Sequence, residues 1–463
     1  MRRRLHLATY DDHVKYGPVV RQGPNRLVFN TITALRDIYL NPRVTKAQVY
    51  THSQFSRSTN IFGTVEKNQH RQKRKLYGQA LSDRSIRAFE PSILEEINVF
   101  LRQLLKAGSA PVDLSPRMEF LTADIAGQLA FGQPLNTQTE EANRILPRAM
   151  ISVNMIISMC MAWPAIGYVR MVLRILNRKK GLAFLRVVQG LVQGRMALPK
   201  DARHDFYSIV AGDMEGEKLR HTELWGEAVF IMPAGGLTSS TLLSAIFFYL
   251  SRYPAVYSRL ASEIRESFGS AKEIQTGPLL SNCKYLRAVI DETLRIAPPL
   301  PSTLWRELGD ASAGPLVVDG QVIPKGTMVG INPFSLMHNA EYFPQPFEFR
   351  PERWLDEAAD TAEDKQQRET MRKAFSPFAL GDTSCLGKTL AYNETSLTIA
   401  KTLWYFDFAK APGEAGKLGQ GTPGSTDGRH RVDEYQLYDT LTADHQGPNL
   451  VFTPRSVDQG ELV

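Results

Sequence analysis

A cysteine at the start of a helix is the side chain in this sequence that is best suited to redox chemistry. Cys385 follows a glycine-punctuated loop from Pro377 to Ser384, and the apolar residues after it recur at helical spacing as far as Trp404. Amide groups at a helix N-terminus and the helix dipole stabilise a thiolate over a thiol. The thiolate is also the form of cysteine that binds iron. For a cysteine on a helix, a buried small hydrophobic residue is the alternative.

The other two cysteines do not form a site with it. Cys160 and Cys283 lie far from Cys385 and from each other in the sequence, and the chain has no Cys-x-x-Cys pair. This pattern predicts neither a disulfide framework nor a zinc site. It fits a reducing compartment.

An acid and a guanidinium also stand at helical spacing. Glu292 and Arg295 are three residues apart, so they become neighbours on one helix face and can pair. A proline-rich turn follows at once, from Pro298 to Pro301. Taken alone, such a pair is typical of a helix surface.

A long apolar helix is expected upstream, from Trp225 to Tyr249. Pro233, Ala234, Gly235 and Gly236 interrupt it, and each glycine costs about 1 kcal/mol relative to alanine in a helix. Either a kink in a core helix or a function at this point would account for so weak a stretch.

Together these motifs resemble the cytochrome P450 family of haem-thiolate monooxygenases. The family pattern F-x-x-G-x-R-x-C-x-G is matched at Phe378, Gly381, Cys385 and Gly387, whereas the arginine is replaced by Thr383. The resemblance implies haem b as cofactor, with Cys385 as the proximal ligand of its iron. It also implies a mainly α fold with a small β portion, in which the haem lies between the long distal helix and the cysteine-bearing proximal helix.

The resemblance extends to the interrupted helix and to the Glu-Arg pair. Ala234, Gly235 and Thr238 match the groove for dioxygen, and the Thr238 hydroxyl is expected to bond the carbonyl four residues back. The acid that the family carries before this threonine is Leu237, so the usual proton relay is altered. The family also implies a buried network that joins Arg353, in a Pro-Glu-Arg-Trp segment, to Glu292 and Arg295.

Three further residues match the family's contacts to the haem carboxylates. They are His70, where the family has tryptophan, and the cations Arg74 and Arg306. For His70 and Arg74 a solvated basic helix face is the alternative. Thr383 is neutral and short and cannot replace the missing arginine, so weaker haem binding is expected.

The resemblance covers the whole chain and predicts one catalytic domain over residues 1–463. It comprises an N-terminal hairpin at about 16–30, a helical body at about 68–300, and a β portion with the cysteine loop at about 301–463. A second hairpin is expected at 316–323, and loops at 356–370 and 410–431. The residues ahead of the first hairpin contain no apolar run, so no membrane anchor is expected there. Only residues 149–169 have the length of a membrane span, and they are expected to form two apolar helices broken at Trp163.

The net charge of +7 is dispersed along the chain, which argues against nucleic acid as a partner. Basic residues near the cysteine loop are expected to receive an acidic NADPH-cytochrome P450 reductase. They are Arg71, Lys73, Arg74, Lys75, Arg372, Lys373 and Lys388. We expect the chain to be soluble. If an anchor is supplied, we expect it at the cytosolic face of the endoplasmic reticulum, with peripheral membrane contact.

The sequence is most similar to filamentous-fungal family members of secondary metabolism. We therefore expect oxidation of a hydrophobic small molecule with dioxygen and NADPH electrons. The apolar segments 50–62, 150–168, 230–237 and 301–304 are expected to form the pocket wall. Oxidative coupling or rearrangement at the same haem is an alternative, and so is a haem-binding protein with little turnover.

Overall fold

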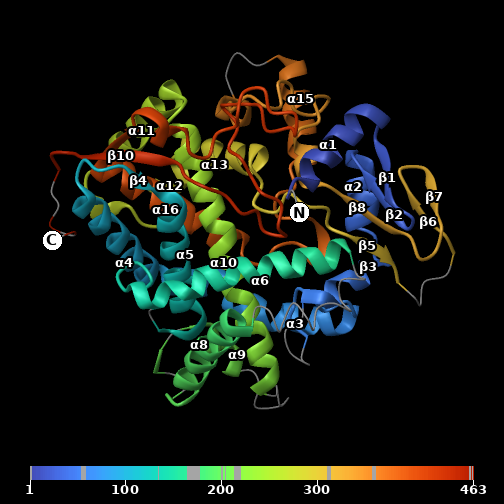
Figure 1. Ribbon diagram of the computed structural model, residues 1–463, viewed down its shortest axis with the longest axis horizontal. Coiled ribbons are helices and arrows are strands. Elements are labelled where there is room, and N and C mark those ends of the chain that lie inside the picture. Colours follow the sequence, from blue (N-terminus) through green and yellow to red (C-terminus); the bar gives the residue numbers. More distant parts are fainter. Residues whose placement is uncertain are drawn as a thin grey trace.

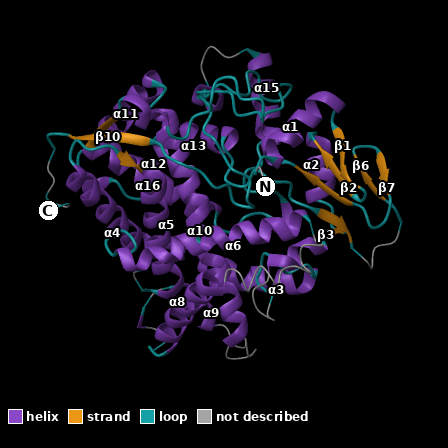
Figure 2. Cartoon of the chain, viewed as in Figure 1, coloured by secondary structure: helices purple, strands orange, loops and turns teal. Residues whose placement is uncertain are grey.

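The fold is described from a computed structural model of the chain. It describes residues 3–53, 59–133, 135–163, 178–199, 202–203, 205–212, 221–309, 314–356, 361–457, 460 and 462. Helices dominate these residues, and the strands gather at two edges of the molecule (Figure 2). The predicted mainly α fold with a small β portion is confirmed.

The helical body begins at residue 67 and ends at residue 296. The helices are α1 (Leu5–Tyr16), α2 (Ile32–Tyr39), α3 (Lys67–Ala80), α4 (Asp83–Ala107), α5 (Leu114–Phe131), α6 (Ile145–Ala162), α8 (Arg178–Met196), α9 (Phe206–Gly212), α10 (His221–Leu250), α11 (Pro254–Ser267), α12 (Pro278–Asn282), α13 (Lys284–Ile296), α14 (Pro333–Met337), α15 (Ala362–Ala374) and α16 (Lys388–Tyr405). The long helix α10 crosses the middle of the molecule (Figure 1). It is the apolar helix that the sequence predicts around the Pro-Ala-Gly-Gly interruption.

The larger sheet brings together strands that are far apart in the sequence. Its order is β1 (Val19–Gly23), β2 (Arg26–Phe29), β8 (Met328–Ile331), β5 (Arg306–Leu308) and β3 (Val44–Lys46). Strands β1 and β2 form the N-terminal hairpin predicted at 16–30. The pairing of β3 with β5 places Lys46 directly opposite Arg306.

Two smaller sheets complete the β portion. One has the order β4 (Val112–Asp113), β10 (Asn449–Pro454) and β9 (Phe406–Lys410), and the other pairs β6 (Leu316–Val318) with β7 (Gln321–Ile323). Asp319 and Gly320 turn this second hairpin with φ angles of 50° and 74°. Two consecutive positive φ angles are typical of the tight turn that Asp-Gly favours, so the predicted hairpin is confirmed.

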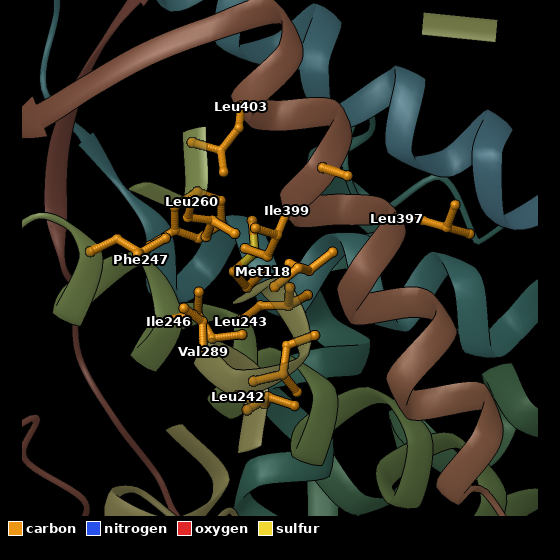
Figure 3. Close-up of a cluster of buried hydrophobic side chains, with 14 of the residues drawn as sticks. Met118, Leu242, Leu243, Ile246, Phe247, Leu260, Val289, Leu397, Ile399 and Leu403 are labelled. Atoms are coloured by element: carbon orange, nitrogen blue, oxygen red, sulfur yellow. The ribbon is translucent and has the colours of Figure 1, made fainter. Parts of the chain in front are cut away.

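The hydrophobic core lies where α10 meets α5, α13 and α16. Figure 3 shows Leu242, Leu243 and Ile246 of α10 beside Met118, Val289 and Ile399, and all six side chains are buried. Burial of side chains of this size stabilises the folded chain by about 1.5 to 3 kcal/mol each. This packing fixes the C-terminal half of α10 and the helix α16, which follows Cys385, against the same neighbours.

One predicted loop is wrong. Residues 356–370 were expected to lack regular structure because they are polar and charged, yet α15 begins at Ala362 within them. Thr361 and Asp364 form a reciprocal capping box at its start, which satisfies two backbone amides and favours a helix without an apolar face. The N-terminal helix α1 was not predicted either.

Among the described residues, two helical segments have the length and composition of membrane spans, Glu141–Ala162 and Phe230–Leu250. The second belongs to the core helix α10 and is 67% buried, and the first is 44% buried. Helix α6 ends at Ala162, so the predicted break at Trp163 is confirmed. The second half of the predicted pair, residues 164–169, lies outside the described residues.

Candidate functional site

The cysteine loop is held against the first part of the chain. The Cys385 amide donates to the Phe378 carbonyl at 2.8 Å, and the Phe378 ring packs on Tyr392 with ring centroids 5.3 Å apart. Gly381 has a φ of 66°, and a Cβ there would lie 2.2 Å from the Tyr39 carbonyl oxygen. Only glycine combines this backbone angle with so close an approach.

The Cys385 sulfur lies at the start of α16, as predicted, and solvent reaches its side chain. A Cβ at Gly387 would stand 3.9 Å from the sulfur, and the Gly387 amide helps to lower the pKa of the thiol. The surrounding protein nevertheless shields this thiol, and burial raises the pKa of Cys385 above its ordinary value. The expected stabilisation by helix amides is therefore present, but burial outweighs it in the free thiol. A bound metal favours the thiolate directly.

Two of the predicted carboxylate-binding cations reach the same loop. The Arg74 guanidinium donates to the Ser384 carbonyl at 2.6 Å and to its hydroxyl at 2.9 Å. The Arg306 guanidinium donates to the Thr383 hydroxyl at 2.7 Å and to the Tyr50 hydroxyl at 3.2 Å. Thr383 thus provides an acceptor for Arg306 where the family has a third cation.

Sequence reasoning missed a third cation in this cluster. Lys46 is buried opposite Arg306, and its ammonium donates to the carbonyls of Ile61 and Phe62 at 2.7 and 2.9 Å. Burial, then Arg306 and Arg74, lower its pKa well below the ordinary lysine value, although Glu227 acts in the opposite direction. The sequence shows only a lysine at the end of a short strand. Its place beside Arg306 becomes evident only when the pairing of β3 with β5 is known.

His70 completes the cluster as a neutral imidazole. Burial, followed by the charges of Lys46, Arg74 and Arg306, lowers the pKa of His70 to about 3. Its ring is therefore uncharged at neutral pH and can donate one hydrogen bond. In the described part of the chain, no carboxylate lies within ion-pair distance of Lys46, Arg74 or Arg306. The cluster therefore suits an anionic ligand that brings its own carboxylates.

The predicted bond of the Thr238 side chain to the helix backbone is present in α10, which stays a continuous helix. The Thr238 hydroxyl donates to the Ala234 carbonyl at 2.7 Å, four residues back. From the other side, the Thr122 hydroxyl of α5 donates to the Gly236 carbonyl at 2.8 Å. Helix α5 packs beside this turn: a Cβ at Gly236 would lie 3.8 Å from the Ala123 backbone, an ordinary van der Waals distance. Leu237 is buried. The distal helix thus has an apolar side chain at the position where the family carries an acid.

The predicted ion network is present and fully buried. The Arg295 guanidinium donates to both carboxylate oxygens of Glu292, at 2.9 and 2.8 Å, and Arg353 donates at 3.1 Å. The Arg350 amide and the Trp354 indole add two more donors at 3.0 and 2.9 Å. Burial alone would raise the pKa of Glu292, but these partners together lower it below the ordinary value.

Comparison with known proteins identifies the family. The cytochrome P450 family model matches residues 5–426, which include every site residue described above. The chain belongs to the cytochrome P450 family. This family consists of oxidoreductases that use haem b and electrons from a redox partner, so the predicted cofactor and enzyme class are confirmed.

The similar curated proteins are fungal. Cytochrome P450 monooxygenase poxM of Penicillium oxalicum is 35% identical over 97% of this chain and 85% of its own length. Cytochrome P450 monooxygenase atnE of Emericella nidulans is 34% identical, with 98% and 88% covered. A cytochrome P450 monooxygenase of Gibberella zeae is 35% identical, with 90% and 97% covered.

The donor set of this P450 fits haem. A single accessible cysteine sulfur at a helix start suits an iron ligand, and the cation cluster beside it suits the two carboxylates of the porphyrin. Arg74 links the two parts, because it contacts Ser384, the residue before Cys385. Among the described residues no group of three His, Cys, Asp or Glu side chains could hold a metal ion by itself.

Aromatic and aliphatic side chains form one cluster from the predicted wall segments. The Phe62 ring contacts the Tyr50 ring at 5.0 Å and stacks on the Phe230 ring at 5.1 Å between centroids. Ile157 of α6 and Trp305, just beyond the proline-rich turn, join the same cluster. The wall residues 54–58 and 164–168 lie outside the described residues.

The basic residues near the cysteine loop do not share one surface. Lys73 is buried and pairs with Glu227 at 2.7 Å, so this predicted docking residue is wrong. Arg74 is partly buried and donates to Ser384, and its docking role stays a prediction. Arg372 and Lys388 line a groove of about 760 Å³ whose wall includes residues 376–380 of the cysteine loop. Its charged lining consists of Arg259, Lys284, Arg287, Arg372 and Lys388 against Asp291 and Asp356.

Proposed function

We propose that this chain is a haem-thiolate monooxygenase that oxidises a hydrophobic small molecule in fungal secondary metabolism. One observation carries the proposal: a cluster of cations lies against the loop that holds an accessible cysteine. It comprises buried Lys46 and Arg306 and partly buried Arg74, and no described carboxylate pairs with any of the three. Such a cluster is costly unless an anion is bound, and the two haem carboxylates meet this requirement. The fungal monooxygenase relatives support the reaction class.

The residues divide the task of holding haem. Cys385 supplies the sulfur ligand, and Phe378, Gly381 and Gly387 shape its loop. Arg74, Arg306 and Lys46 would balance the porphyrin carboxylates, and neutral His70 would donate a hydrogen bond to one of them. When bound, the haem iron supplies the activation of dioxygen with electrons that originate from NADPH.

The distal side of the haem is assigned to the turn of α10 from Ala234 to Thr238. Ala234 and Gly235 leave room beside the helix axis, and Thr238 presents a hydroxyl whose own proton is committed to the Ala234 carbonyl. Its oxygen lone pairs are therefore free to accept a proton or a hydrogen bond at this point. With Leu237 as neighbour, the proton must come from water or from a carboxyl on another element.

Glu292, Arg295 and Arg353 take a structural part. Their network joins α13 to the 3₁₀ turn at Pro351–Trp354, ahead of the cysteine loop. A network that satisfies every buried charge keeps these segments in one arrangement. We assign it no contact with substrate.

The substrate is proposed to be hydrophobic and partly aromatic. The ring cluster of Tyr50, Phe62 and Phe230 supports this choice, because aromatic walls favour ligands with large apolar surfaces. The altered proton relay favours oxidative coupling or rearrangement as a second candidate reaction. The product mass separates the two, since hydroxylation adds one oxygen and coupling removes two hydrogens.

The proposal is tested by the carbon monoxide difference spectrum of the reduced protein. We expect the thiolate-type Soret band in the native chain and in a Cys283→Ser control, and its loss in Cys385→Ser. Haem that binds without this band would leave only a haem-binding protein. Absence of haem from all three proteins would overturn the proposal.

Partner and location follow as finer proposals. An NADPH-cytochrome P450 reductase is proposed to dock at the basic groove, where positive charge meets the acidic partner. Peripheral contact with the endoplasmic reticulum membrane is proposed through exposed Tyr16 and Trp163. Arg26, which donates to the Met161 and Ala162 carbonyls, holds the end of α6 against the N-terminal hairpin. Residues 1–463 are proposed to form a single catalytic domain.

A further inference from the structure

A small cavity with mainly polar lining residues lies beside the turn of α10 that carries Leu237 and Ser240. It is lined by Leu237 and Ser240 of α10, by Glu119 of α5, by Asn154 of α6 and by Asp444 in the C-terminal loop. Its volume is about 10 Å³, which is close to the space that one water molecule needs. Position 237, where the family carries its acid, thus lines the same cavity as Glu119, an acidic residue of another helix.

Glu119 is poised to be protonated near neutral pH. Burial, then the negative charges of Asp444 and Asp113, raise the pKa of Glu119 to about 8, and Arg148 acts in the opposite direction. No donor among the described residues hydrogen-bonds its carboxyl group. A carboxyl that is neutral at rest and lacks a fixed partner can give up a proton.

The other charged groups around the cavity are already occupied. Asp444 pairs with Arg3, and His445 is neutral because burial lowers its pKa to about 4. The His445 ring is engaged by the Tyr435 hydroxyl at 2.9 Å. Glu119 is therefore the carboxyl of this cavity that is available for proton transfer.

The cavity adjoins the turn that carries Thr238. The hydroxyls of Ser240 and Thr241 donate to the Leu237 carbonyl at 3.0 and 2.8 Å, and Thr122 holds the Gly236 carbonyl from the side of α5. These side-chain bonds are added to a helix that is continuous from His221 to Leu250. A water in the cavity would lie next to the turn that carries Leu237 and Thr238.

We propose that Glu119 supplies protons to the distal groove through water in this cavity and so replaces the acid missing at Leu237. One proton passes from the carboxyl to the water and on toward the Thr238 hydroxyl, and one proton from solvent restores the acid. This inference rests on the proposed function. In this proposal Glu119 contacts neither substrate nor cofactor. It acts through the cavity water and Thr238, and is therefore a positioning residue and not a catalytic one.

The first test measures the carboxyl itself and needs no turnover. Infrared spectra of the holoprotein are recorded from pH 6 to 10, and the carbonyl stretch of protonated acids is compared between native chain and Glu119→Gln. We expect a difference band that disappears with a midpoint near pH 8. Glu96→Gln is the matched control, because burial also raises the pKa of Glu96 to about 7 but this residue does not line the cavity. No titrating difference band near pH 8 would overturn the proposal.

The second test measures proton supply with the reductase and without added substrate, as NADPH oxidation by dioxygen in H₂O and D₂O. We expect the native rate to fall above pH 8, and Glu119→Gln to be about tenfold slower and independent of pH there. Glu119→Asp should recover part of the rate, and Leu237→Asp should restore it in the Glu119→Gln background.

Two results would overturn the role of Glu119. One is an unchanged pH profile and solvent isotope effect in Glu119→Gln. The other is the same loss in Glu394→Gln instead, since the buried carboxyl of Glu394 reaches the Ser239 hydroxyl at 3.2 Å. Failure of the proposed function is distinguishable, because it would abolish the carbon monoxide band in the native chain and leave the infrared titration intact.

Discussion

Lys46 and Arg306 face each other across the pairing of β3 with β5, and both side chains are buried. Like charges placed directly opposite each other in a sheet destabilise it. Their common neighbours are Arg74 and neutral His70. Burial, followed by this concentration of positive charge, lowers the pKa values of Lys46 and His70. The arrangement is unfavourable in the empty protein and favourable once an anion binds.

The first prediction concerns Lys46. Lys46→Met should speed haem loss to an excess of an acceptor apoprotein by about 10- to 100-fold, because a charge-assisted contact of roughly 1.5 to 3 kcal/mol is removed. The same change should leave the apoprotein equally or more stable to heat. Lys75→Met, on the exposed face of α3, serves as the control. A lower melting temperature of the Lys46→Met protein, with and without haem alike, would show instead that Lys46 acts through packing.

The second prediction concerns Thr383. From the sequence alone we expect weaker haem binding, because this threonine stands where the family has an arginine. Since Lys46 already supplies a third cation, we expect Thr383→Arg to slow haem loss only slightly in the native chain. In the Lys46→Met background it should recover most of the lost retention, because the new guanidinium then fills the missing charge. Haem-transfer rates of the four proteins decide this. Equal slowing in both backgrounds would show that Lys46 and position 383 act independently.

The third prediction concerns the buried network. Glu292→Gln should cost about 3 to 5 kcal/mol of stability, since it leaves Arg295 and Arg353 without their counter-charge. Exposed Glu341→Gln is the control, and denaturant unfolding gives both values. The pKa of Glu292 is lowered in the fold, so its stabilising effect is present above the unfolded pKa and is lost only as pH falls through the folded pKa. A stability difference that grows between pH 5 and 8 would contradict this assignment.

The sequence predicted the site where local spacing carries the information. The Cys385 loop, the Thr238 bond to Ala234 and the Glu292 pair all follow from residues a few positions apart. Lys46 was missed because its partner, Arg306, is set by strand pairing over 260 positions of chain, which single-sequence patterns do not encode. Lys73 was misassigned for a related reason: a basic helix face does not reveal that Glu227 buries one of its lysines.

The fourth prediction concerns Glu394 of the proximal helix. Burial raises the pKa of Glu394 to about 8, so the folded state binds this proton more tightly than the unfolded state and stability falls as pH rises from about 4.5 to 8. Glu394→Gln keeps the Ser239 contact and removes the ionisation. It should therefore be more stable than the native chain by a few kcal/mol at pH 9, with the difference shrinking toward zero near pH 5. Thermal unfolding across this range provides the measurement, with exposed Glu363→Gln as control.

The fifth prediction separates the groove from the buried basic residues of α3. Lys388→Glu and Arg372→Glu should each raise the KM for reductase several-fold, and turnover of the native chain should fall as salt is added, because exposed charges steer an acidic partner. Lys75→Glu, exposed on α3 but not among the residues that line the groove, should leave the KM for reductase nearly unchanged if the groove alone receives the partner. A flat salt profile, or an equal effect of all three variants, would place the reductase elsewhere. Arg372 pairs with Asp356 at 3.1 Å, so its variant also frees that carboxylate, and the Lys388 variant gives the cleaner comparison.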